Sequence, residues 1–161
     1  MLFRSSLQPG RHYTLVVDRD WHDGWGQPLD KDYRREFQTV AADTTPISLA
    51  TWTLTVPKAG TTDPVAVAFG EPLDRALMLR ALAVRPVGMP VLPGDARAGE
   101  ADRSWTFEPE MRWKPGRYEL IASSVLEDLA GNQIGRPFEV DTFRRVESTD
   151  PTITSRAFEI R

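Results

Sequence analysis

Hydrophobic residues recur at every second position along most of the chain. The alternation is clearest at residues 13–17, 52–56, 65–69, 105–107, 118–122 and 138–140. A period of two places successive side chains on opposite faces, which is the pattern of half-buried antiparallel β-strands. Residues 33–39 and 81–87 are also expected to be strands. The pattern therefore predicts an all-β fold.

Turn-forming residues separate these runs, and one short stretch is expected to be helical. Gly, Pro, Asp and Asn gather at residues 8–10, 23–24, 58–60, 92–95, 114–116 and 130–132. The stretch 72–82 opens with Pro72, a residue that suits the first helical position, and it places Leu73, Ala76 and Leu77 on one face. Many short strands joined by frequent turns favour a β-sandwich.

Two segments about a hundred residues apart resemble each other. Residues 7–15 read Leu-Gln-Pro-Gly-Arg-His-Tyr-Thr-Leu, and residues 113–120 read Trp-Lys-Pro-Gly-Arg-Tyr-Glu-Leu, so that His12 is an insertion in the first copy. The match continues with the pairs Asp23 and Asp128, Gly26 and Gly131, and residues 37–39 and 140–142. A repeat of this period indicates two copies of one structural unit.

The position of the repeat predicts one complete unit and one partial unit. Predicted strands precede the second copy but not the first. Residues 1–40 therefore represent only the last strands of a unit, residues 41–46 a linker, and residues 47–143 a complete unit. Residues 144–161 form a tail with one extra strand, which resembles the start of the complete unit and suggests the first strand of a third.

The repeated motif has the residues of a tyrosine corner. Pro115 and Gly116 supply the turn, and the ring of Tyr118 is expected to pack inward while its hydroxyl bonds to a backbone group upstream. Tyr13 is expected to have the same role in the first copy. A second turn then leads to the last strand, where Asp128 caps the turn and Gly131 and Asn132 tolerate positive φ.

These motifs resemble the C-terminal half of bacterial immunoglobulin-like domains of the S-layer (SbsA-like) kind. In that family a Pro-Gly-x-Tyr strand leads to an Asp-Leu-Ala-Gly-Asn turn, as at residues 115–118 and 128–132, and residues 67–74 resemble an earlier strand. The first copy departs from the family at residues 20–26, which leaves the geometry of that turn open. The resemblance implies an immunoglobulin-like antiparallel β-sandwich that serves as a non-catalytic structural or adhesive module.

The resemblance also implies a location and partners. Such modules are extracytoplasmic, on the cell surface or secreted, and this sequence has no signal peptide, so we expect it to belong to a longer exported chain. The expected partners are neighbouring immunoglobulin-like domains. A homodimer through residues 1–40 and 150–161 is a further expectation, because residues 1–40 are too few to bury their own apolar side chains.

Composition excludes several functions. The 161 residues carry a net charge of −3 and no cysteine, which argues against nucleic acid as a partner and excludes disulfides and thiol chemistry. The sequence contains no stretch of the roughly 20 apolar residues that a membrane helix needs. It also lacks phosphate-binding glycine loops and a Gly-x-Ser-x-Gly nucleophile motif. We therefore expect no enzymatic activity, no cofactor, no nucleic acid and no membrane span.

Two groups of residues remain as candidate sites. Trp21 and Trp25 share one loop, where they suit either a carbohydrate-binding module for cell-wall or other polysaccharides or a cover for the junction with the next domain. An accessory domain of a secreted hydrolase is a further alternative. The other three tryptophans, Trp52, Trp105 and Trp113, are expected in the core.

The second group is acidic. Asp18, Asp20 and Asp23 are weak calcium candidates, because the loop lacks a third carboxylate in the expected register and has Leu29 where a calcium loop has Glu. Solvated turn carboxylates are the favoured interpretation.

Overall fold

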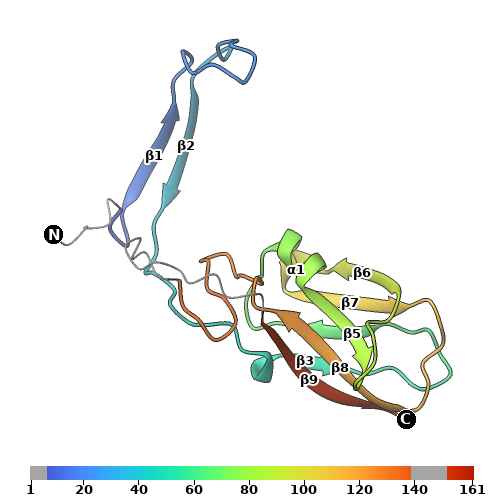
Figure 1. Ribbon diagram of the computed structural model, residues 1–161. Helices are drawn as coiled ribbons and strands as arrows, with labels where there is room; N and C mark the ends of the chain where they lie inside the picture. The colour runs from blue at the N-terminus through green and yellow to red at the C-terminus, as the bar shows by residue number, and fades with distance from the viewer. Residues whose placement is uncertain (1–6, 139–151) are drawn as a thin grey trace. The chain divides into compact units, whose positions relative to one another are not determined.

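The computed structural model describes residues 7–138 and 152–161 and divides the chain into two compact units (Figure 1). Unit 1 spans Met1–Asp43 and unit 2 spans Thr44–Arg161, so the boundary falls inside the predicted linker at residues 41–46. The described residues form antiparallel strands with one short α-helix, which confirms the prediction of a mainly β protein with antiparallel sheets.

Unit 1 is built on a single β-hairpin. Its strands are β1 (His12–Val17) and β2 (Tyr33–Gln38), both of which the sequence analysis predicted. They pair antiparallel, and the pairing places six side chains on one face, namely Tyr13, Leu15, Val17, Tyr33, Arg35 and Phe37. Five of these six are apolar or aromatic. The hairpin therefore has one apolar face and one polar face.

Unit 2 contains two antiparallel sheets. One has four strands in the order β3-β4-β7-β6, and the other has three in the order β5-β8-β9. The strands are β3 (Thr53–Thr55), β4 (Val65–Ala68), β5 (Leu82–Pro86), β6 (Gly94–Ala98), β7 (Ser104–Pro109), β8 (Gly116–Ser123) and β9 (Ile153–Ile160). Two short 3-10 turns, η1 (Leu49–Thr51) and η2 (Glu100–Asp102), complete the unit together with helix α1 (Arg75–Ala81).

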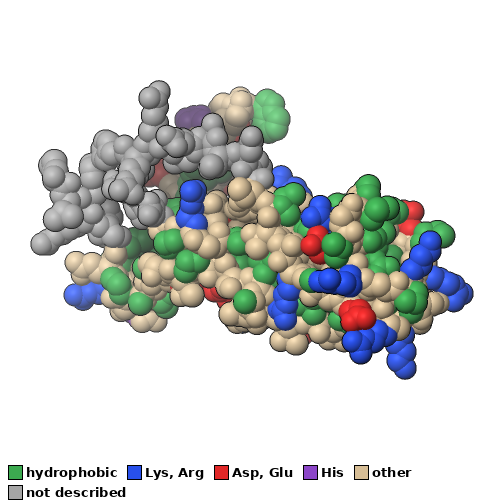
Figure 2. Space-filling model, turned by 60° about the horizontal axis from the view of Figure 1, so that its bottom comes forward, with side chains coloured by type: hydrophobic (Ala, Val, Ile, Leu, Met, Phe, Trp, Pro, Cys, Tyr) green, Lys and Arg blue, Asp and Glu red, His purple; other side chains and the backbone are tan. Residues whose placement is uncertain are grey.

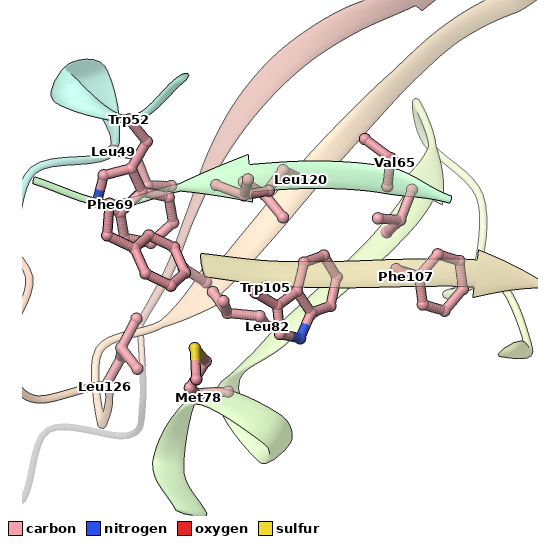
Figure 3. Packing of buried hydrophobic residues seen from close by; sticks show 14 of the residues in the cluster. Leu49, Trp52, Val65, Phe69, Met78, Leu82, Trp105, Phe107, Leu120 and Leu126 are labelled. Carbon is pink, nitrogen blue, oxygen red and sulfur yellow. The ribbon is translucent and has the colours of Figure 1, made fainter. Parts of the chain in front are cut away.

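The two sheets share one hydrophobic core (Figure 3). The four-stranded sheet contributes Val65, Val67, Trp105 and Phe107, and the three-stranded sheet contributes Leu82, Val84, Leu120 and Ala122. The rings of Trp105 and Phe107 stack along β7 with centroids 6.0 Å apart. Trp52 and Trp113 are also buried, so the prediction of three core tryptophans is confirmed.

The sequence pattern missed strand β6. Its first residues belong to the Leu-Pro-Gly-Asp stretch at 92–95, which suggests a turn, and its side chains alternate only weakly between partly buried and exposed. β6 forms because its backbone pairs with β7 at the edge of the sheet. Conversely, Phe138 is not in a strand, and the rest of the predicted strand at 138–140 lies outside the described residues.

Helix α1 begins later than predicted. Asp74 is its N-cap, and the Asp74 carboxylate accepts a hydrogen bond of 2.8 Å from the Leu77 amide. Arg75, the residue after this cap, is therefore the first helical residue, and the prediction that Pro72 occupies that position is wrong. The helix buries Met78 and Ala81 against the core. In the described ranges, no helix is long and apolar enough to cross a membrane.

The tail belongs to unit 2. β9 pairs with β8 over its whole length, and Ile160 is buried in the shared core. The Arg156 guanidinium also donates hydrogen bonds to the carbonyl oxygens of Leu49, at 2.8 Å, and Trp52. A domain boundary at residue 143 is therefore wrong, as is the assignment of the tail to a third unit. The extra strand itself is confirmed.

Candidate functional site

The two hairpins β1–β2 and β8–β9 share one register. Tyr13 lies opposite Phe37 in unit 1, and Tyr118 lies opposite Phe158 in unit 2. The paired rings stack in both places, with centroids 5.9 Å apart in the first hairpin and 5.8 Å apart in the second. The structural equivalent of β2 is thus β9. Residues 140–142, which the sequence aligned with residues 37–39, lie outside the described residues.

The equivalence continues at the next position of the same face. Leu15 lies opposite Arg35, and Leu120 lies opposite Arg156. The sequence analysis missed these two arginines. A signal for them was present, because each arginine stands two residues before the phenylalanine of its strand in an Arg-x-Phe pattern.

The tyrosine hydroxyls bind the backbone at equivalent positions. The buried Tyr118 side chain donates a hydrogen bond of 2.9 Å to the carbonyl oxygen of Lys114, just before the turn at Pro115 and Gly116. The predicted burial and hydrogen bond of Tyr118 are therefore confirmed. In unit 1 the Tyr13 hydroxyl accepts a hydrogen bond of 2.8 Å from the backbone amide of Gln8, which the repeat aligns with Lys114.

Removing the Tyr118 hydroxyl is expected to cost about 1 kcal/mol of unfolding free energy, because Tyr118→Phe breaks one hydrogen bond and leaves the Lys114 carbonyl without that donor. Tyr13→Phe is expected to cost less, since its hydrogen bond is solvent-exposed. Urea unfolding of both variants and the parent chain measures the difference. A Tyr118→Phe variant as stable as the parent would contradict this role.

The turn after β8 is organised by Asp128. One carboxylate oxygen, Oδ1, accepts hydrogen bonds from the amides of Ala130 at 2.7 Å and Asn132 at 2.9 Å. The Asp128 amide donates to the Asn132 carbonyl, and the Asn132 side-chain amide donates to Oδ2 of Asp128. Gly131 has φ 88°, a conformation that glycine adopts without strain. Asp128 and Asn132 are both buried.

The loop between β1 and β2 contains a turn with the same hydrogen bonds. Oδ1 of Asp23 accepts from the amides of Trp25 at 2.8 Å and Gln27 at 2.9 Å, and the Asp23 amide donates to the Gln27 carbonyl. Gly26 has φ 80° at the position of the glycine in the second turn. The residues between the aspartate and the glycine differ in the two turns, yet the hydrogen bonds of the aspartate and the positive φ of the glycine are the same.

This turn holds Trp25 at an exposed tip. Trp25 is 89% exposed and Trp21 is 65% exposed, and both belong to the loop between β1 and β2. A backbone bridge between His22 and Pro28 closes the loop between them. The loop between β1 and β2 therefore presents two largely exposed indoles.

The acidic candidates of the same loop do not converge. No trio of ligand atoms from Asp18, Asp20 and Asp23 lies within 4.8 Å in the part of the chain that the structure describes. Asp18 instead accepts a hydrogen bond from the Asp20 amide, and Asp20 lies 3.7 Å from the Arg19 guanidinium with both side chains exposed. These contacts fit turn and surface carboxylates better than calcium ligands.

The ionic pairs of unit 2 among the described residues are exposed or only partly buried. The pKa of the Glu159 carboxyl is lowered chiefly by the hydrogen bond that Arg161 donates to it, and both side chains are exposed. Arg85 and Glu119 form a partly buried pair across β5 and β8, at 2.9 Å. Figure 2 shows Lys and Arg side chains interspersed with hydrophobic ones on one face of the molecule. Exposed pairs of this kind contribute little to stability.

No protein-family model, no curated protein and no solved structure matches this chain. Its function therefore has to be inferred from the repeated hairpin, the turns and the exposed tryptophans.

Proposed function

We propose that the chain is a non-catalytic structural or adhesive module of an immunoglobulin-like β-sandwich type, within an extracytoplasmic multidomain protein of bacteria. The repeated hairpin carries this proposal. The stacked Tyr–Phe pair, the Leu–Arg pair and the aspartate turn all occur in both units. Domains that repeat along one chain build extended structures whose length and surface, rather than a catalytic centre, provide the function.

The path of the chain through unit 2 supports a role in series with other domains. Residues 46–50 lie beside Thr154 and Ser155, near the start of β9. At the other end of β9, the carbonyl oxygen of Arg161 accepts a hydrogen bond from the Ala59 amide. β9 has eight residues and is about 26 Å long. Residues 46–50 and Arg161 thus lie at opposite ends of one strand, so tension applied between them acts across the unit.

Stretching the full chain between its two ends by atomic force microscopy tests the structural role. Because unit 2 spans Thr44–Arg161, its unfolding is expected as one force peak that lengthens the chain by about 40 nm. Leu120→Ala is expected to lower that force, since it opens a cavity in the core between the sheets. Extension without a resolvable peak would contradict the role of a spacer that resists force.

Carbohydrate binding is the second candidate, and the exposure of Trp21 and Trp25 favours it. In this case the chain is expected to co-sediment with an insoluble polysaccharide such as chitin or cellulose, and replacement of both tryptophans by alanine is expected to weaken binding about tenfold or more. Leu129→Ala is the matched control, because Leu129 is an exposed apolar residue in the equivalent turn of unit 2. Equal binding by the two variants would exclude a tryptophan site.

A further inference from the structure

The two equivalent hairpins differ in how their apolar faces are covered. In unit 2, Leu120 on β8 is 1% exposed because this face packs into the core between the sheets. In unit 1, the equivalent Leu15 is 50% exposed, and Tyr33 and Phe37 on the same face are exposed as well. A two-stranded hairpin with an uncovered apolar face is only marginally stable in water.

The outer edge of β1 also lacks the partner that β8 has. β8 lies between β5 and β9, whereas the described strands of unit 1 form a sheet of β1 and β2 alone. The Arg11 carbonyl bonds to the Thr39 amide on the β2 side, so by alternation the backbone groups of His12, Thr14 and Val16 point away from β2. Unpaired strand edges of this kind bind further strands.

The backbone groups at the equivalent positions of β8 show which kind of strand can pair with the edge of β1. The strand register corrects the sequence alignment, which made His12 an insertion: His12 directly precedes Tyr13 as Arg117 precedes Tyr118, so the two are equivalent. The Arg117 carbonyl accepts a hydrogen bond from the Val87 amide at the end of β5. β5 then continues antiparallel along β8, with Val84 opposite Leu120. The edge of β1 therefore presents the backbone groups that bind a strand like Leu82–Pro86.

Arg35 adds a charged group to the same surface. Its equivalent, Arg156, donates hydrogen bonds to the carbonyl oxygens of Leu49, the first residue of η1, and Trp52, the residue after η1. The Arg35 side chain has no hydrogen bond or ion pair with the residues that the structure describes, and it lies on the apolar face of its hairpin. A turn with free carbonyl oxygens, like η1, would accept hydrogen bonds from the Arg35 guanidinium.

We propose that the β1–β2 hairpin is a docking surface for the remaining strands of a second domain of the unit 2 type. Its occupant is a polypeptide segment equivalent to residues 44–114, with a strand like β5 for the open edge of β1 and a turn like η1 for Arg35. A second copy of the chain fits less well, because its own β5 and η1 already bind β8 and Arg156. Two hairpins packed face to face would also bring two Arg35 side chains together.

Extending the chain tests this surface directly. A duplicate of residues 44–114 replaces residues 1–8, so that it joins Pro9 as the original segment joins Pro115. Amide hydrogen exchange, resolved by NMR, is then compared with that of the unextended chain. The amides of His12, Thr14 and Val16 are expected to exchange at least about 100-fold more slowly in the extended chain.

Substitutions within the extended chain identify the contacts. Leu15→Asp and Arg35→Ala are each expected to reverse the slowing at least in part, because their side chains lie on the docking face. Val16→Ala is the matched control, since Val16 is a similarly exposed side chain on the opposite face of the hairpin, and it is expected to retain the slow exchange.

Three results would overturn the proposal. The first is unchanged exchange at the three amides in the extended chain. The second is slow exchange in the unextended chain together with a dimeric mass by light scattering, which would make a second copy the occupant. The third is slow exchange in an unextended chain that is monomeric, which would show that another segment of the same chain protects the edge of β1. The inference rests on the same repeat that supports the proposed function. The two can nevertheless fail separately, because the force peak of unit 2 in the unextended chain is measured independently of the hairpin.

Discussion

Leu120→Ala is expected to lower the unfolding free energy of unit 2 by about 2–5 kcal/mol, whereas Leu15→Ala is expected to change it by less than about 0.5 kcal/mol. The two leucines hold the same register in equivalent hairpins, opposite Arg156 and Arg35. Only Leu120 is buried, so only its truncation removes apolar contacts and leaves a cavity in the core.

Urea unfolding followed by far-UV circular dichroism measures both effects. The slope of the unfolding free energy with urea is expected to stay constant, so that the shift in midpoint reports stability alone. Leu120→Met, which keeps side-chain volume, is the control and is expected to cost less than about 1.5 kcal/mol. Equal losses for Leu15→Ala and Leu120→Ala would show that the Leu15 face is covered.

Asp128→Ala is expected to cost about 2 kcal/mol or more. The buried carboxylate accepts hydrogen bonds from the Ala130 and Asn132 amides and from the Asn132 side chain, and its removal leaves these donors unpaired. Each buried unpaired donor costs about 1–3 kcal/mol.

Asp23→Ala is the matched comparison for that turn. Asp23 makes the same two backbone hydrogen bonds through Oδ1, but in an exposed loop where water replaces the lost acceptor. Its substitution is expected to leave the midpoint of unit 2 unchanged. The same urea titrations measure both variants. If Asp128→Ala proved as mild as Asp23→Ala, the buried turn would not contribute to the stability of unit 2.

The amino-acid sequence alone determined the local elements of this protein. Alternation of apolar residues predicted β1, β3, β4, β7 and β8, because burial of one strand face needs that period wherever the strand pairs, and β2 and β5 were also expected as strands. The Pro-Gly-x-Tyr repeat predicted the Tyr118 hydrogen bond, since turn and tyrosine lie within four residues of each other. Burial of Trp52, Trp105 and Trp113 also followed from the pattern.

Part of the candidate site could likewise be predicted. The glycine-containing loop at residues 20–26 suggested exposed positions for Trp21 and Trp25, because loops run over the protein surface, and both side chains are exposed. The shared geometry of the Asp23 and Asp128 turns was not predicted. Their intervening residues differ, whereas the hydrogen bonds depend on the aspartate carboxylate and on a glycine with positive φ.

Only the tertiary structure decided which distant segments pair. β6 has little alternation of its own and exists because the edge of β7 supplies its hydrogen bonds. β9 follows β8 by some thirty residues, so no local pattern could assign it to unit 2. The hydrogen bond of Arg156 depends on η1 lying beside β9, and the expected role of Arg35 follows from its equivalence to Arg156. Strand pairing and side-chain contact depend on the residue that arrives from elsewhere in the chain, and local periodicity does not encode that residue.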